Sequence, residues 1–98
     1  MPVNQKENLF IVAMEECSEL TKELSKCLRF GLDNHKPDNP DMLNSEALIT
    51  EYAQLCGTME RLFKENGITV DEHLVSQIKE FKNSKVDLYF EETKRVGI

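Results

Sequence analysis

The stretch KENLFIVAMEECSELTKELSKCLRF, residues 6–30, decides the fold class of this 98-residue chain. Its apolar residues recur every three or four positions, as on one face of an α-helix, rather than at every second position as in a strand. On a helical wheel they form a stripe about 100° wide: Leu9, Phe10, Ala13, Cys17, Leu20, Leu24, Cys27 and Leu28. We therefore expect an amphipathic helix from near Lys6 to Phe30, ended by Gly31 in the left-handed region.

A second helix is expected after a connecting loop. Residues 31–40 are rich in turn formers and include Pro37 and Pro40, which oppose helix continuation, so this segment predicts an exposed loop. The helix after it begins near Asn44 or Ser45 and ends at Asn66-Gly67. Its apolar stripe consists of Leu48, Ile49, Tyr52, Leu55, Cys56, Met59, Leu62 and Phe63.

A third helix is indicated by a capping box, with Thr69 as N-cap and Glu72 at the third helical position. It would turn Leu74, Val75, Ile78 and Phe81 inward. The sequence leaves open whether this helix continues through Asn83-Ser84 or breaks there into a fourth. No segment has the alternation of a strand. The patterns predict an all-α fold, an antiparallel helical hairpin plus a C-terminal helix or helices, in a single domain of residues 1–98.

The composition of the chain argues against two classes of binding partner, nucleic-acid polymers and membranes. The chain has 12 basic and 18 acidic residues, a formal net charge of −6, which argues against binding a nucleic-acid polymer through its phosphates. No apolar run is long enough to span a bilayer, so we expect no membrane partner. The three cysteines have no metal-binding spacing, which favours a cytoplasmic location. So short a chain often needs a partner chain or a bound ion to be stable.

Acidic residues gather at one edge of each of the first two helices. Glu16, Glu19 and Glu23 fall within about 60° of one another beside the first apolar stripe. Glu51 lies at the edge of the second stripe, so packing the two stripes together would bring it towards Glu16 and Glu19. Oxygen ligands of this kind suit magnesium or manganese. The alternative is that these residues form the solvated face of an amphipathic helix.

The segment from Glu15 to Gly31, with its Arg-Phe-Gly ending, resembles the first motif of the MazG-like nucleoside triphosphate pyrophosphohydrolases. That family has an ExxE motif on one helix and an ExxD motif on the next. The resemblance assigns ExxE to Glu16 and Glu19, and the second motif to Glu51–Gln54, where Gln54 replaces the family's Asp. The match extends from about Asn8 to Lys82.

The resemblance implies hydrolysis of a nucleoside or deoxynucleoside triphosphate to the monophosphate and pyrophosphate. Magnesium, or manganese in its place, would be held by Glu16, Glu19, Glu51 and Gln54. Either Glu19 or Glu23 would orient the attacking water as general base. The resemblance also implies a four-helix-bundle-like core completed by oligomerisation, in a homodimer or a homotetramer.

Candidate substrate-binding residues complete this hypothesis. Cationic side chains that would meet the remaining phosphate charge are Lys26 and Arg29, with Lys79, Lys82 and Lys85 as a second set. Asn8 lies on the same side of the first helix as Glu19, where it would contact a base or sugar. For each lysine the alternative is an ordinary solvated side chain.

Gln54 leaves a second hypothesis open. An amide oxygen binds magnesium more weakly than a carboxylate because it carries no charge. The chain is therefore either an active pyrophosphohydrolase or a catalytically weakened nucleotide-binding protein that sequesters or senses a nucleotide. A helical interaction domain without a ligand is the third alternative.

Overall fold

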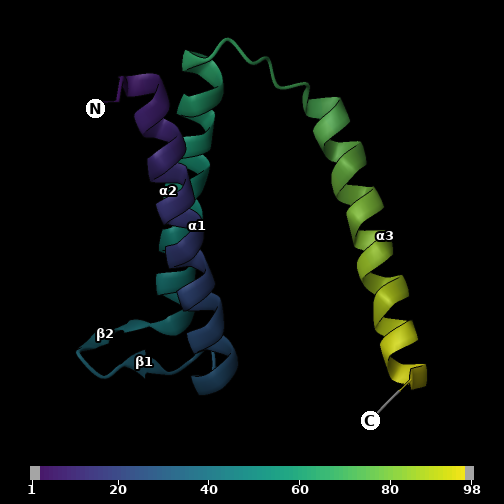
Figure 1. Ribbon diagram of the computed structural model, residues 1–98. Coiled ribbons are helices and arrows are strands. Elements are labelled where there is room, and N and C mark those ends of the chain that lie inside the picture. The colour runs from purple at the N-terminus through teal and green to yellow at the C-terminus, as the bar shows by residue number, and fades with distance from the viewer. Residues whose placement is uncertain (1–2, 97–98) are drawn as a thin grey trace. The chain divides into compact units, whose positions relative to one another are not determined.

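The computed structural model describes residues 3–96, apart from the side chains at positions 36, 95 and 96. Its elements, in order, are α1 (Gln5–Phe30), β1 (His35–Lys36), β2 (Asn39–Leu43), α2 (Asn44–Glu65) and α3 (Glu72–Val96) (Figure 1). The fold is all-α, as the sequence predicts, because the two strands form only a small ribbon between the first two helices.

The chain divides into two compact units at the junction of Ile68 and Thr69. The first unit contains α1, the two strands and α2, and the two helices lie side by side as an antiparallel pair (Figure 1). The second unit contains α3. The assignment of residues 1–98 to a single domain stays a prediction.

Local signals fix the ends of the helix pair. The side chain of Asn4 accepts a hydrogen bond of 2.8 Å from the backbone of Glu7, so it caps the first turn of α1. Gly31 has φ +92°, a value that favours glycine, and its N–H donates to the Cys27 carbonyl. Gly67, just beyond α2, has φ +68°. The predicted bounds of both helices are therefore confirmed to within about a residue or two.

The connection between the helices differs from the loop that the sequence predicts. β1 and β2 pair antiparallel, with His35 opposite Leu43 and Lys36 opposite Asn39. Pro40 is tolerated in β2 because a two-stranded ribbon has open edges, where a missing N–H breaks no ladder. The strands were not recognised in the sequence because they are too short to show alternation.

The third helix begins later than its predicted N-cap. The Asp71 carboxylate accepts hydrogen bonds from the backbone of His73 and Leu74, at 3.0 and 3.3 Å. Asp71 therefore caps the helix, and the assignment of that role to Thr69 is wrong. The helix continues through Asn83-Ser84 without a break. Among its described side chains, all but Val75 are exposed.

The buried core lies between α1 and α2. Leu9, Ala13 and Leu62 form its centre, and Met59 and Phe63 pack against it. The predicted stripe on α1 is only partly inside, however. Phe10, Leu24 and Leu28 are exposed, Leu28 by 88%, whereas Glu23 is buried and Glu16 is half-buried.

On α2 the same change is visible. Ile49 and Tyr52, predicted core residues, are exposed, while Ala47 is buried and Glu51 is half-buried. Both helices thus turn inward a face that is rotated from the predicted apolar stripe towards its acidic edge. Part of each stripe remains on the outside of the pair.

Candidate functional site

The inward rotation places acidic side chains at the seam between α1 and α2. Glu23 is only 4% exposed, and Glu16 and Glu51 are half-buried. The Nζ of Lys26 lies 3.7 Å from Oε1 of Glu23, so a partly exposed cation accompanies this buried carboxylate. A buried charge is costly without such a partner.

A groove of about 420 Å³ runs between the two helices. It brings together three of the predicted site residues, Asn8 and Glu16 from α1 and Gln54 from α2. Gly57 also lines it, and a Cβ at that position would meet nothing within 4 Å, so this part of the groove is open. The groove therefore joins the first residue of the ExxE motif to the last residue of the second motif.

Two other predicted ligands are placed differently. The Glu19 side chain is 49% exposed and forms an ion pair of 3.1 Å with Lys22. Glu51 is not among the residues that line the groove. Within residues 3–96, no group of three or more His, Cys, Asp or Glu side chains is arranged to hold a metal ion. The donor atoms are of the type that magnesium prefers, but the ligand set is not assembled in this single chain, and the metal site stays a prediction.

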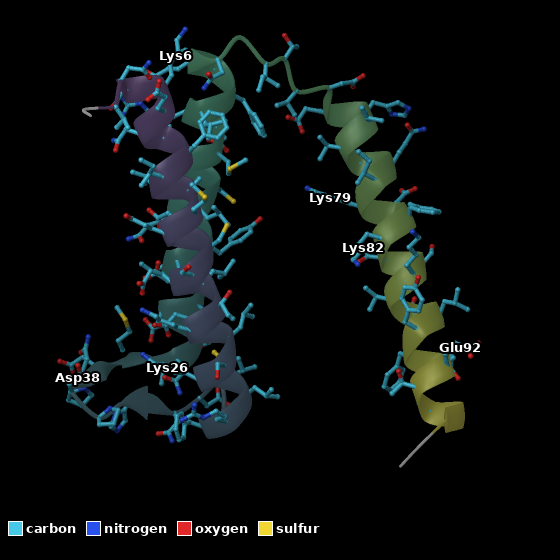
Figure 2. The ribbon with its side chains drawn as sticks, viewed as in Figure 1. Lys6, Lys26, Asp38, Lys79, Lys82 and Glu92 are labelled. Atoms are coloured by element: carbon cyan, nitrogen blue, oxygen red, sulfur yellow. The ribbon has the colours of Figure 1, made fainter. Side chains whose placement is uncertain are left out.

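The predicted phosphate-binding residues lie in three places. Lys26 lines a different pocket, at the strand end of the helix pair. Arg29 is exposed, with its guanidinium carbon 4.9 Å from the centroid of the Phe30 ring. Lys79 and Lys82 are exposed on α3, in the second unit (Figure 2). Within the first unit, neither Lys26 nor Arg29 is among the residues that line the groove.

Arg61 was missed by the sequence analysis. It lines the groove with Thr58, and its Nε donates to Oε2 of Glu65 at 3.2 Å. The available signal was helical spacing, because Gln54, Thr58 and Arg61 are four and three residues apart and so share one face of α2. An arginine on the same face as a predicted ligand provides the groove with a cation.

An apolar groove on another side of the helix pair is formed by predicted core residues that are half-buried or exposed. It is lined by Leu20, Leu24, Leu48, Ile49 and Tyr52. A side-chain hydrogen bond with Cys56 raises the pKa of the Tyr52 hydroxyl above its usual value, and repulsion from the negative charge of the Cys56 thiolate raises it further.

No family model, curated protein or solved structure matches this chain. In the described part of the chain, every helix is too short or too polar to cross a lipid bilayer.

Proposed function

We propose that this protein hydrolyses a nucleoside or deoxynucleoside triphosphate to the monophosphate and pyrophosphate, with magnesium or manganese as cofactor, in the cytoplasm. The observation that supports the proposal is the groove shared by Glu16 and Gln54. These two residues come from the two helices that carry the ExxE and ExxD-like motifs. The groove volume falls within the usual range for small-molecule sites.

Different residues of the groove would contact the phosphates, the base or sugar, and the cation. Arg61 is the side chain suited to bidentate contact with phosphate oxygens, and it would exchange its exposed pairing with Glu65 for the ligand. The amide of Asn8 offers a donor and an acceptor to a sugar or base. Glu16 would provide negative charge for a cation that lies between the protein and the triphosphate.

Catalysis requires water to attack the α-phosphorus while the bond from that phosphorus to the oxygen bridging to the β-phosphate breaks. Glu16, Glu19, Glu51 and Gln54 would hold the magnesium ion, which would neutralise phosphate charge and acidify a water. Glu19 is better suited than Glu23 to orient the water, because Glu23 is buried beside Lys26 and Glu19 is half exposed. Carboxylates gathered at one site repel one another unless a cation lies between them, so such a ligand set would need the bound ion to be stable.

Assembly as a homodimer or homotetramer is part of the proposal. The apolar groove lined by Leu20, Leu24, Leu48, Ile49 and Tyr52 supports it, since three of these predicted core residues, Leu24, Ile49 and Tyr52, are exposed in the single chain. Ile49→Glu should lower the mass measured by light scattering to that of one chain. Thr50→Glu, at the neighbouring exposed position, should leave the mass unchanged, and an equal effect of both variants would contradict this interface.

A catalytically weakened nucleotide-binding protein is the second candidate, and Gln54 specifically favours it. Its amide lines the groove where the related motif has a carboxylate. The site therefore has less negative charge to hold a cation. Such a protein would bind a nucleotide without releasing pyrophosphate.

Incubation of the full chain with each NTP and dNTP in the presence of magnesium, with pyrophosphate measured, tests the proposal. Glu16→Gln should reduce turnover by about 100-fold or more, whereas Glu15→Gln, an exposed neighbour on a different face, should leave it unchanged. Triphosphate binding without pyrophosphate release would favour the second candidate. Absence of both binding and release would leave a helical interaction domain.

A further inference from the structure

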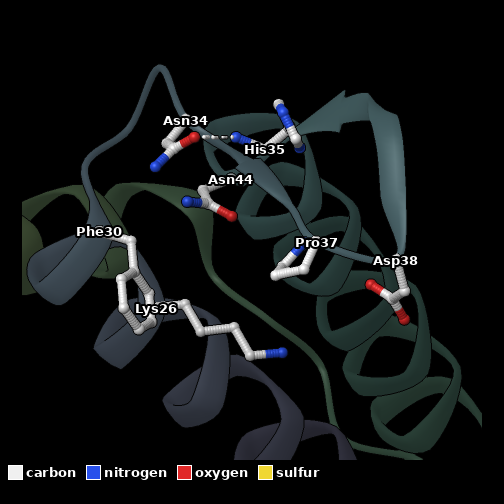
Figure 3. A pocket seen from close by; sticks show the side chains of 7 residues that line it. All are labelled: Lys26, Phe30, Asn34, His35, Pro37, Asp38 and Asn44. Atoms are coloured by element: carbon white, nitrogen blue, oxygen red, sulfur yellow. Dashed lines mark hydrogen bonds between the residues drawn. The ribbon is translucent and has the colours of Figure 1, made fainter.

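A second pocket of about 220 Å³ lies where the end of α1 meets the two strands (Figure 3). It shares none of its described lining residues with the groove of Glu16 and Gln54. Lys26, at its edge, follows Glu16 by ten residues, which corresponds to about 15 Å along a helix axis. The pocket is therefore a separate place on the helix pair.

The walls of this pocket are held by hydrogen bonds centred on Asn44. Asn44 is only 2% exposed, and its Nδ2 donates to the Gly31 carbonyl at 2.9 Å. Its backbone N–H donates to the carbonyl of Asn34 at 2.7 Å. Asn34 in turn accepts from the backbone of His35 through Oδ1, at 2.9 Å. The pocket is thus shaped by the chain itself before any ligand binds.

Its shape suits one planar ring system. The Phe30 ring and Pro37 both line the pocket, and they provide flat apolar surfaces (Figure 3). Arg29 does not line the pocket, and its guanidinium carbon lies 4.9 Å from the centroid of the Phe30 ring. The volume is below the range of roughly 300–1,000 Å³ typical of drug-sized ligands. A single heterocycle fits this size better than a whole nucleotide.

Its polar groups include both a donor and an acceptor of opposite charge. The Lys26 ammonium extends along the pocket towards the side where Asp38 lies, and Asp38 is the anionic acceptor (Figure 3). The amides of Asn34 and Asn44 lie on the other side of the pocket, with Asn34 beside His35 (Figure 3). A ligand that satisfies this lining must be flat and must carry hydrogen-bond donors and acceptors on its edge.

We propose that this pocket binds an amino-substituted nitrogen heterocycle, of the type found in cytosine, adenine and guanine. The ring stacks on Phe30, and its exocyclic amine donates to the Asp38 carboxylate. The ring nitrogen or carbonyl accepts from Lys26. The proposal does not depend on triphosphate hydrolysis, because the pocket and the groove use different residues.

Titration of the full chain with cytidine, adenosine, guanosine and uridine, followed by NMR, tests the proposal without phosphate or magnesium. We expect shifts of the Asn44 side-chain amide and the Phe30 ring resonances. Cytidine should bind about five-fold more tightly than uridine, which lacks the amine. Absence of shifts at millimolar concentration, or equal binding of cytidine and uridine, would overturn the proposal.

Substitutions at Phe30 and at Asp38, each with a matched control, locate the binding. Phe30→Ala should weaken cytidine binding by about five-fold or more, and Phe30→Leu, which keeps apolar bulk, should weaken it too. Phe10→Ala removes another exposed phenylalanine of α1 that does not line the pocket, so it should leave binding unchanged. Asp38→Asn should reduce the preference for cytidine over uridine, while Asp41→Asn, also exposed on the ribbon, should preserve it. Unchanged binding in the Phe30 variants would refute the assigned site.

Discussion

The two ends of the α1/α2 pair are held together by different forces. At one end Leu9, Ala13 and Leu62 exclude water from an apolar cluster. At the other end the buried residues include Asn44 and Glu23, which depend on directional polar contacts. Apolar contact stabilises through area and tolerates small shifts, whereas a buried polar group is stable only while its partner is in place. The packing of the second end therefore depends on individual hydrogen-bond and ion-pair partners more than that of the first.

The largest expected effect is at the apolar end. Leu62→Ala should lower the free energy of unfolding by about 3 kcal/mol, because it removes buried side-chain volume and leaves a cavity. Urea denaturation measures the loss. Leu28→Ala, at a highly exposed position, should change stability by no more than about 0.5 kcal/mol. Similar losses in both variants would show that the apolar cluster does not dominate stability.

At the polar end, Asn44→Ala should lower the free energy of unfolding by about 1–2 kcal/mol, since the Gly31 carbonyl loses its donor. The same denaturation experiment applies. Asn83→Ala, which replaces an exposed asparagine within α3, serves as control and should stay within about 0.5 kcal/mol of the parent. No loss in the Asn44 variant would mean that this hydrogen bond is dispensable.

Alanine substitutions at Gly31 and Gly57 should change the stability of the fold in opposite directions. Gly31→Ala forces a side chain to φ +92° and should cost about 1 kcal/mol or slightly more. Gly57→Ala, within α2, meets nothing within 4 Å and should stabilise by up to about 1 kcal/mol through helix propensity. Melting temperatures compare the two. A stabilising Gly31 variant would contradict the backbone conformation at the strand end.

The smallest effect concerns Tyr52, midway between the two ends. Cys56→Ala removes the hydrogen bond that favours the protonated phenol, so the pKa of Tyr52 should fall towards its ordinary value. Phenolate would then appear at lower pH in an ultraviolet titration. Cys17→Ala, at an exposed position on α1, should leave the titration unchanged, and an unchanged curve for Cys56→Ala would exclude the thiol as the cause.

The sequence predicted the helix bounds better than the helix faces. Gly31 and Asn66-Gly67 are local signals, and they end α1 and α2 where expected. The direction of the buried face of each helix was predicted wrongly. A helical wheel takes the middle of the apolar stripe as the buried face, whereas two packed helices cover only part of each stripe. Which part they cover depends on contacts between helices, such as Leu9 with Leu62, that no local pattern contains.

The candidate site was predicted in part. Asn8, Glu16 and Gln54 lie in one groove because the antiparallel pairing aligns their positions along the two helices. Glu19 and Glu51 do not join them there, and Lys26 belongs to another pocket. Arg61 and the Phe30 pocket were missed, since the pocket depends on how the ribbon folds back on α1. Short-range spacing cannot encode that arrangement.

Asn44 anchors both the start of α2 and the segment that follows α1, through contacts with Gly31, Asn34 and Cys27. The tip of the ribbon, at Pro37 and Asp38, lies beyond these anchors. Residues at the tip are consequently free to change in type and in number without disturbing the register of the helices. Substitutions at the tip can therefore change which ligand the small pocket binds, while the α1/α2 pair keeps its structure.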